Sequence, residues 1–406
     1  MYNRLSKEQR EEFEKIILAL GETLDITATQ YNALVQSYNA VGKFLQDDPE
    51  LGSYDPLVSP QGSLRLGTII QPVNEGDDMD VDLVFRLNDK NPVWTQQTLK
   101  DKVGARLKNS PRYSKMLDKE GKRCWTLIYR QDSENLKERY HMDILPSVAS
   151  KDYDEQMRLV LAEAFDVNKI DKISIRITDK ERAGYYTQTD IRDWLKSNPD
   201  GYAIWFASRC KENVSKRQLL MEDIIPIGKY NPNKTPLQRI VQILKRHRDI
   251  MFDHDDDKPI SIIITTLAAR AYKGEADVLE GLVNVAAHMK NYIIKDTDGS
   301  DKVANPLNPS ENYAEKWKIV PKKRENFYKW LDAVNRDLNT ILSSNGPAIW
   351  NSMKKPFGQI IVESANKRYA EIKKTGFSSG AKIASTGVLG SIGHALNAGN
   401  TFYGEK

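Results

Sequence analysis

The stretch that decides the fold is residues 61–85, which read QGSLRLGTIIQPVNEGDDMDVDLVF. It begins with a small-residue turn at Gly62 and Ser63 and ends in a strand that carries Asp80 and Asp82. The backbone N–H groups of such a turn suit a phosphate, because each phosphate oxygen needs a donor and a bulky side chain would block its approach. Two aspartates spaced i, i+2 on a strand point to one face and can hold a divalent cation. The stretch therefore predicts a site for a nucleoside triphosphate with its magnesium.

Alternating apolar and polar side chains predict the strands around this stretch. In residues 80–87 the odd-numbered positions form an apolar face, and both aspartates lie on the opposite face. Residues 139–145 have the same alternation and place Asp143 on the polar face. Pro146 is expected to end that strand, because proline cannot donate to a sheet ladder. The remaining strands of the sheet are expected at residues 123–130 and 172–178.

Helical periodicity surrounds the predicted sheet. Ser6 and Gln9 have the spacing of a capping box at the start of an amphipathic helix that extends to Leu20. A second helix is expected over residues 31–45, and both helices are expected to pack across the back of the core. Residues 190–196 are also expected to be helical. Beyond the prolines near residue 226, further helices are expected at 236–250, 259–272, 276–294 and 322–343.

These elements predict an α+β fold, with a mixed twisted sheet and a separate group of helices. A chain of 406 residues is long enough for about two or three domains. The expected division is a core with N-terminal helices over 1–225 and a helical domain over 226–375. A flexible tail rich in Gly, Ser and Ala is expected over 376–406.

Bulk composition excludes several classes of protein. The chain is 29% charged with a net charge of +4, so it lacks the dense basic stripe that strong sequence-independent nucleic-acid binding requires. The N-terminus is too polar for a signal peptide, and no apolar run is long enough to span a bilayer. Cys124 and Cys210 form no zinc motif with the histidines and are expected to be inert. We therefore expect a cytoplasmic protein without a membrane partner.

The paired aspartates also have an ordinary interpretation, because most isolated D-x-D patterns are exposed acids at a strand edge. Three observations favour a metal site. Asp80 and Asp82 interrupt an apolar strand, where an unpaired buried charge is costly; the Gly-Ser turn lies upstream; and Asp143 has the same phasing on a second strand. Three such carboxylates can hold two Mg²⁺ ions about 4 Å apart, and Mn²⁺ can substitute. Asp143 is the expected general base for an attacking hydroxyl, or a ligand that assists the base.

Together these motifs resemble the core of the CD-NTases, bacterial relatives of cyclic GMP-AMP synthase and oligoadenylate synthetase. The resemblance implies a bilobed enzyme, with a polymerase-β-like nucleotidyltransferase core and a helical C-terminal lobe that closes the nucleotide pocket. Such an enzyme makes a cyclic di- or trinucleotide second messenger for antiphage defence of the CBASS type. ATP is the expected substrate, with GTP or a pyrimidine NTP as further candidates. The matching segments lie within about residues 10–370 and are Gln61-Gly62-Ser63, Gly67-Thr68, Gly76 to Asp82, Asp143, Asn198 to Tyr202, Pro236 to Arg246, Asn305-Pro306 and Asn312 to Trp317.

The resemblance also implies roles for individual residues. The three aspartates would be the metal ligands. Leu66 stands where some relatives have a stacking aromatic residue, so base recognition is expected to use apolar contacts or another aromatic. The zinc insert of the DNA-sensing animal enzyme is absent, so DNA activation is not implied. Nucleotide contacts are expected from Gln61, Gly62 and Ser63 to the donor, from Lys245 and Ser261 to its phosphates, and from Asn305, in place of a frequent aspartate, to its base.

Without the family, several of these residues have simpler interpretations. Lys245 would be a solvated lysine on an amphipathic helix, and Ser261 would be an ordinary residue at a helix N-terminus. His141 either orders the neighbouring aspartate, lies beside an acceptor nucleotide, or is structural. Trp205 and Trp317 are expected in the core rather than as stacking platforms.

Two other functions compete with messenger synthesis. One is a nucleotidyltransferase that modifies RNA or a protein, as a toxin or antitoxin would. The other is a non-catalytic nucleotide sensor. The missing basic stripe argues against a polymer acceptor, and the retention of all three carboxylates argues against a pure sensor. NTPs are the expected substrates, and the tail is the expected docking or conjugation site for an accessory regulatory protein.

Overall fold

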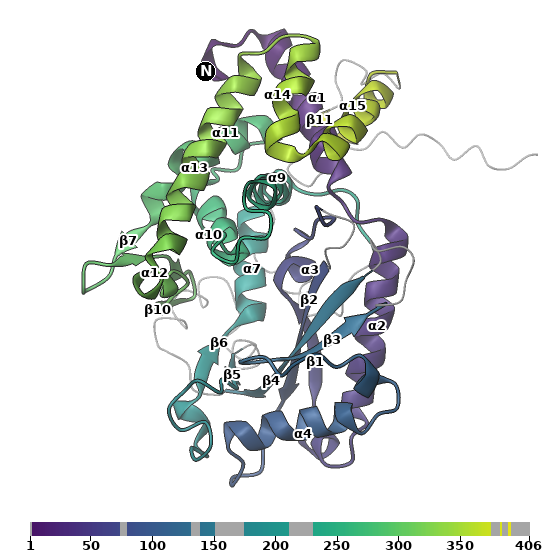
Figure 1. Ribbon diagram of the computed structural model, residues 1–406, viewed down its shortest axis with the longest axis vertical. Helices are drawn as coiled ribbons and strands as arrows, with labels where there is room; N and C mark the ends of the chain where they lie inside the picture. The colour runs from purple at the N-terminus through teal and green to yellow at the C-terminus, as the bar shows by residue number, and fades with distance from the viewer. Residues whose placement is uncertain are drawn as a thin grey trace, which may run out of the picture.

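The computed structural model describes residues 2–73, 79–130, 139–150, 174–210 and 230–374, together with the backbone of 382–383 and 389–390. Figure 1 shows two lobes: a sheet with flanking helices, named the sheet lobe, lies below a group of helices, named the helical lobe. This is the bilobed α+β arrangement that the sequence predicted.

The sheet lobe is built on a mixed sheet. In the described part of the chain the sheet has six strands in the order β1-β2-β4-β5-β6, with β3 also paired to β4. β2 and β4 run parallel, and the other described pairs are antiparallel. The strands are β1 (Leu57–Gln61), β2 (Met79–Leu87), β3 (Trp125–Tyr129), β4 (Tyr140–Ala149), β5 (Ile175–Ile177) and β6 (Leu195–Ser197).

The two-faced pattern of the central strands is confirmed. Val81, Leu83 and Phe85 of β2 are at most 1% exposed and belong to one apolar cluster, which also contains Met142 and Ile144 of β4. The aspartates occupy the alternate positions, so they lie on the opposite face of the same two strands. The core face of the sheet therefore fixes which way the acidic side chains point.

The prediction that Pro146 ends its strand was wrong, because β4 continues to Ala149. β3 pairs with β4 only as far as Ile144, and β5 pairs with it only from Ser147. Pro146 lies between these two ladders, so its missing N–H removes no hydrogen bond from either of them. Its carbonyl still accepts from the Thr178 N–H at 3.4 Å.

The prediction of a helix over 190–196 was also wrong. Residues 191–193 form a single 3₁₀ turn, and residues 195–197 form strand β6 on β5. Nη1 of Arg176 donates to the carbonyl oxygens of Arg192 and Trp194, at 2.8 and 2.9 Å. These long-range bonds hold the segment extended at the sheet edge and override its local periodicity. Of the predicted strand 172–178, β5 covers only residues 175–177, and residues 172–173 lie outside the described residues.

Helices account for most of the remaining described residues, including the four that were predicted beyond residue 226 as α9, α10, α11 and α13. α9 begins with the capping box of Thr235 and Gln238 and with a proline at its first turn. The helices are α1 (Lys7–Thr23), α2 (Ala28–Gln46), α3 (Gly62–Leu66), α4 (Gln96–Lys108), α7 (Pro199–Cys210), α9 (Pro236–Met251), α10 (Ser261–Ala271), α11 (Val278–His288), α12 (Lys316–Ile319), α13 (Pro321–Leu342), α14 (Pro347–Phe357) and α15 (Gln359–Lys374).

The two N-terminal helices belong to different hydrophobic cores. The apolar residues of α2 pack with the sheet, as expected. Those of α1, such as Phe13 and Ile17, instead pack with α9, α11 and α15 in the helical core. Figure 1 shows α1 among the upper helices and α2 beside the sheet. The predicted domain boundary at 225/226 lies outside the described residues, and we retain the three-part division as a proposal.

None of the described helices has the length and hydropathy that a membrane span requires. Most of the predicted tail, 376–406, lies outside the described residues. Within it, the short strands β11 (Lys382–Ile383) and β12 (Leu389–Gly390) form an antiparallel pair. Two further short pairs in the helical lobe join β7 (Ile294–Lys295) to β8 (Asp301–Lys302) and β9 (Ala304–Asn305) to β10 (Asn308–Asn312).

Candidate active site

A cavity of about 960 Å³ lies between the two lobes. Its walls come from α3, β2 and β4 of the sheet lobe and from α9 and α10 of the helical lobe. Seven of the nine predicted site residues line this cavity, and Gln61 and Asn305 are not among its lining residues. The seven that the fold brings together are Gly62, Ser63, Asp80, Asp82, Asp143, Lys245 and Ser261.

The parallel pairing of β2 and β4 aligns the acids. Asp82 is the direct register partner of Asp143, and Asp80 is the partner of His141. Neighbouring strands lie about 4.8 Å apart, so the two carboxylates of the first pair leave the sheet side by side. The hydroxyl of Thr126 on β3 donates to Oδ1 of Asp143 at 2.5 Å, which fixes the rotation of that carboxylate.

The electrostatics of the acids follow from their crowding. Burial, and then the like charges of Asp143 and Asp80, raise the pKa of Asp82 to about 7. Desolvation and the like charge of Asp143 also raise the pKa of Asp80, which lines the cavity as well. The positive charge of Lys245 acts in the opposite direction and lowers the pKa of both aspartates. A site that concentrates negative charge in this way stabilises a cation placed among the carboxylates.

Gly62 forms the turn beneath these acids. Its φ of +62° lies in the left-handed region that favours glycine. A Cβ atom at this position would lie closer than 3.0 Å to Oδ2 of Asp82, so no other residue leaves that carboxylate in place. Ser63 follows in the first turn of the short helix α3, and its carbonyl accepts from the Thr68 N–H at 2.9 Å.

Lys245 enters the cavity from α9 on the opposite lobe. It is only 7% exposed, which rules out the solvated lysine of the simpler interpretation. Burial, and then the nearby charge of Arg248, lower the pKa of Lys245 to about 8. Its Nζ donates to the Thr68 carbonyl at 3.1 Å. Its positive charge also acts to lower the pKa values of Asp80 and Asp82. A buried cation and the acids therefore lie in the same cavity.

Two further cations line the cavity, Arg248 and Lys258, and neither was among the predicted site residues. Arg248 lies one turn after Lys245 on α9, and its Nη2 donates to the hydroxyl of Ser261 at 3.2 Å. The i, i+3 spacing within the basic run of residues 245–248 was the available signal, since it places both side chains on one face of the helix. Lys258 belongs to the loop before α10, and no local pattern points to it.

Asn305 lies outside the cavity, and its side chain is engaged in its own loop. Its Nδ2 donates to Oε2 of Glu311 at 2.7 Å, and its Oδ1 accepts from the Leu307 N–H at 2.9 Å. Gln61 is the last residue of β1 and the register partner of Asp82, directly before the glycine turn. Neither residue provides a lining contact in this arrangement, so their predicted nucleotide contacts stay predictions.

The cavity wall beside the turn is apolar rather than aromatic. Leu66, at the position where some relatives have a stacking ring, is joined there by Ile69, Ile70 and Met79. This wall can accept the face of a base through apolar contact. The predicted core positions of Trp317, which is 5% exposed, and of half-buried Trp205 are confirmed, because both pack in the helical core.

The donor set of the cavity fits a hard divalent cation. The acids supply oxygen donors only, and they carry charges that the protein itself only partly compensates. Among the described residues, no three Asp, Glu, His or Cys side chains already converge on one point. Oδ1 of Asp143 is turned toward Thr126, and Oδ2 of Asp82 lies against Gly62. The residues therefore match the ion in chemistry, and its exact ligands stay a proposal.

Comparisons with known proteins agree with this fold. Residues 12–159 match the family model of the Second Messenger Oligonucleotide or Dinucleotide Synthetase domain, a range that contains all three aspartates. The chain is 27% identical to a c-di-GMP synthase of Roseivirga ehrenbergii over 99% of this chain and 100% of that protein.

Two solved structures share the fold. The CD-NTase CdnG of Bradyrhizobium diazoefficiens, in complex with GTP, has a TM-score of 0.63 and 18% identity, and it covers 88% of this chain and 99% of its own. CdnC of E. coli MS115-1 with ATP has a TM-score of 0.55 and 15% identity, and it covers 85% of this chain and 97% of its own.

A mixed sheet that presents three aspartates to a cavity closed by helices defines a nucleotidyltransferase. In its matched synthetase domain and in its fold the chain is similar to the CD-NTases, the family that the sequence motifs resemble.

Proposed function

We propose that the protein joins two GTP molecules into a cyclic dinucleotide with release of two pyrophosphates. The product suggested by the relative from Roseivirga ehrenbergii, which is named a c-di-GMP synthase, requires GTP alone. GTP is also the ligand of the similar CdnG structure. This proposal replaces the sequence-based preference for ATP.

The main support for this proposal is that the three aspartates and the buried cations Lys245 and Arg248 line the same cavity.

In each of two transfers, a ribose hydroxyl oxygen bonds to the α-phosphorus of the other nucleotide, and the bond from that phosphorus to the pyrophosphate breaks. Lys245 and Arg248 face the leaving pyrophosphate, whose charge rises as the bond breaks. To Asp143, whose carboxylate Thr126 holds, we assign the role of taking the hydroxyl proton.

Magnesium would be held by Asp80, Asp82 and Asp143, which offer the oxygen ligands that this ion prefers. When bound, it neutralises charge on the triphosphate and lowers the pKa of the attacking hydroxyl. The protein's own contribution is to hold the two nucleotides in line, which accounts for a large share of catalysis in phosphoryl and nucleotidyl transfer.

Synthesis of a second messenger suggests a biological role for the protein and a docking site for a partner protein. We place the protein in antiphage defence, as the family resemblance implies. The CdnC relative has been solved as a complex with HORMA-deltaN, so accessory partners exist among proteins of this fold. We propose that the segment 376–406 is the site where such a partner docks or is conjugated.

Product analysis tests the proposal. The purified protein is incubated with GTP alone, ATP alone and all four NTPs, each with Mg²⁺, and the products are mapped by mass spectrometry and linkage-specific nucleases. We expect a cyclic di-GMP from GTP alone, with two pyrophosphates released for each product molecule and without any polymer acceptor. Label transferred only to added RNA or protein would instead support the polymer-modifying alternative, and nucleotide binding without turnover would support a sensor.

GTP binding is expected to weaken as the pH rises from about 7 to about 9. The pKa of Lys245 is lowered to about 8, so the side chain is mostly charged at the lower pH and mostly neutral at the higher one. The dissociation constant for GTP, measured by calorimetry without divalent metal, should increase about tenfold over this range. In Lys245→Arg the cation stays charged, so the increase should be much smaller, limited to the part that ionisation of Asp82 contributes. An equal pH response in both proteins would contradict this assignment.

A further inference from the structure

A short segment on the cavity wall is held through its backbone carbonyl groups as well as through its side chains. Residues 66–72, named the strap, leave α3 and line the cavity. Four side chains of α9 donate hydrogen bonds to carbonyl oxygens of the strap. The pairs are Gln238 to Leu66 at 2.9 Å, Lys245 to Thr68 at 3.1 Å, Gln242 to Ile69 at 2.8 Å and Arg246 to Gln71 at 2.5 Å.

These four donors share one face of α9. Positions 238, 242, 245 and 246 follow the i, i+4, i+7, i+8 spacing of a single helical stripe. Buried carbonyl groups need a partner, and the strap obtains its partners from this stripe. The path of the strap is therefore set by α9, which also carries Lys245 into the cavity.

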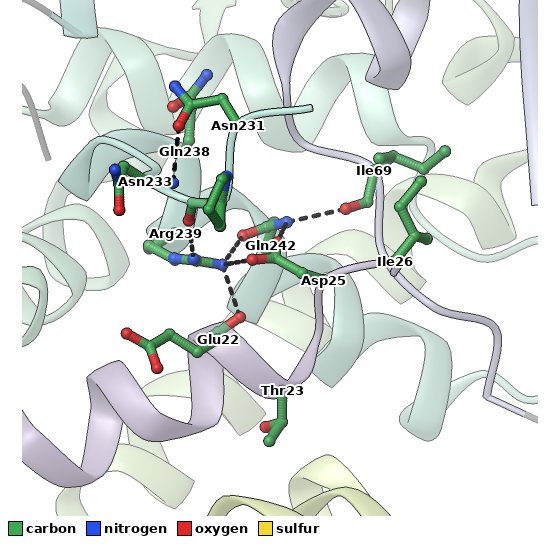
Figure 2. Close-up of polar contacts among 12 residues, drawn as sticks. Glu22, Thr23, Asp25, Ile26, Ile69, Asn231, Asn233, Gln238, Arg239 and Gln242 are labelled. Carbon is green, nitrogen blue, oxygen red and sulfur yellow. Dashed lines mark hydrogen bonds and ion pairs between the residues drawn. The ribbon is translucent and has the colours of Figure 1, made fainter. Parts of the chain in front are cut away.

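Gln242 lies at the centre of the stripe and is completely buried. Figure 2 shows its amide between Ile69 and the Asp25–Arg239 ion pair. Nε2 of Gln242 donates to the Ile69 carbonyl at 2.8 Å and to Oδ1 of Asp25 at 2.9 Å, while Oε1 accepts from Nη1 of Arg239 at 3.0 Å. Both amide hydrogens donate hydrogen bonds, so no aliphatic or acidic side chain can make the same three hydrogen bonds.

The same cluster ties the strap to the end of α1. Nη1 of Arg239 pairs with Oδ2 of Asp25 and donates to the Gly21 carbonyl, both at 2.8 Å. The backbone N–H of Gln71 donates to the Leu24 carbonyl at 2.9 Å. The strap is thus held from two sides, by α9 and by the α1–α2 junction.

This contact lies where the two lobes meet. Leu66 and Ile70 belong to the helical core, whereas Ile69 between them belongs to the sheet core. Lys245 reaches the cavity from the helical lobe and Asp82 from the sheet lobe, so their relative position depends on how the strap is fixed between the cores.

We infer that Gln242 is a positioning residue for nucleotide binding. Its amide fixes the position of the strap relative to α9. The strap and Lys245, which would contact a nucleotide, therefore keep a constant position relative to the carboxylates of β2. This inference rests on the proposal that the cavity is the nucleotide site. Gln242 does not touch the reacting atoms, so its loss should raise KM for the nucleotide more than it lowers kcat.

Gln242→Met is the test variant, because methionine keeps the length and volume of glutamine but cannot donate. Gln96→Met is the matched control. Gln96 is 1% exposed, and its Oε1 accepts from the Asp179 N–H at 2.9 Å on α4, away from the cavity. Both variants lose a buried amide and should lose thermal stability, and Gln242→Met should lose more, because it gives up three hydrogen bonds whereas Gln96→Met gives up the bond to Asp179.

Two readouts separate positioning from simple destabilisation. Hydrogen exchange without nucleotide should become at least about tenfold faster in peptides that cover residues 66–72 of Gln242→Met, and should be unchanged there in Gln96→Met. With GTP and Mg²⁺, KM should rise about tenfold in Gln242→Met, while kcat changes by less than about threefold.

The inference is overturned if the folded Gln242→Met protein exchanges the strap at the wild-type rate or keeps the wild-type KM. It is also overturned if Gln96→Met raises KM to the same extent. A wild-type protein that uses no GTP would refute the proposed substrate instead, and strap exchange in the two variants would still decide whether Gln242 fixes the strap.

Discussion

Asp82→Asn is expected to lower nucleotidyl transfer by about 10³-fold or more, and at the same time to stabilise the metal-free protein at neutral and higher pH. The activity is lost because the amide offers a cation only one neutral oxygen in place of a charged carboxylate. The double replacement of Asp80 and Asp82 by alanine should abolish product formation while the fold survives.

The gain in stability follows from the raised pKa of Asp82. Its value increases from 3.8 to about 7 on folding, so the folded state favours the protonated form. This contribution is fully present below the unfolded value and is lost as the pH rises through about 7. The metal-free wild type should therefore lose stability between about pH 4 and pH 7. The amide side chain of Asp82→Asn cannot ionise, so this variant should lose less stability over the same pH range.

Thermal unfolding with a chelator at about pH 5 and about pH 8 measures this effect, together with the rate of pyrophosphate release with Mg²⁺. Asp193→Asn is the control, because Asp193 is an exposed aspartate that does not line the cavity. The control variant should change neither the thermal stability at the two pH values nor the rate of pyrophosphate release. An Asp82→Asn protein that keeps more than about a tenth of the wild-type rate, or that is less stable than the wild type at the higher pH, would contradict the account.

Gly62→Ala should lower activity by at least about 100-fold. The added Cβ would lie closer than 3.0 Å to Oδ2 of Asp82, so the carboxylate must rotate or the turn must shift. The positive φ of +62° adds about 1–2 kcal/mol of backbone strain for any residue with a Cβ. Both effects act on the proposed phosphate turn and on Asp82, the proposed metal ligand, together. Initial rates and thermal unfolding of the variant measure them separately.

Gly299→Ala is a matched control for the strain. Gly299 also has a positive φ, +80°, but nothing lies within 4 Å of its added Cβ. This variant should lose about 1–2 kcal/mol of stability and keep its activity. If Gly62→Ala loses activity only in proportion to its stability, as Gly299→Ala would, the close approach of Gly62 to Asp82 has no catalytic role.

The sheet and its acids could be predicted because they depend on local periodicity. A strand with apolar residues at every second position can bury only one face, and this fixed the direction of Asp80, Asp82 and Asp143 before any tertiary contact was known. The parallel register that places Asp82 beside Asp143 was not predictable from periodicity, because it depends on how distant strands pair.

Lys245 was identified through the family resemblance rather than through its own surroundings. On the helix alone it has the pattern of an exposed lysine, and its burial results from packing against the strap between the two lobes. Lys258 and the network of Gln242 with Asp25 were missed for the same reason. Their partners are separated from them by many residues in the chain, and no local spacing indicates such contacts.

The errors also have a tertiary origin. The helix predicted at 190–196 was replaced by β6 because Arg176 holds the backbone of that segment extended. Asn305 lies outside the cavity lining, and its own loop provides partners for both of its polar atoms, so its expected contact with the base stays a prediction.

The central claim is that the three aspartates hold divalent cations beside a triphosphate that Lys245 contacts. A crystal structure with Mn²⁺ and a non-hydrolysable GTP analogue, with anomalous diffraction used to locate the metal, tests it most directly. The account predicts manganese roughly 2–2.3 Å from carboxylate oxygens of Asp80, Asp82 and Asp143, with the triphosphate between these ions and Lys245. Manganese bound elsewhere, or a triphosphate outside this cavity, would contradict it.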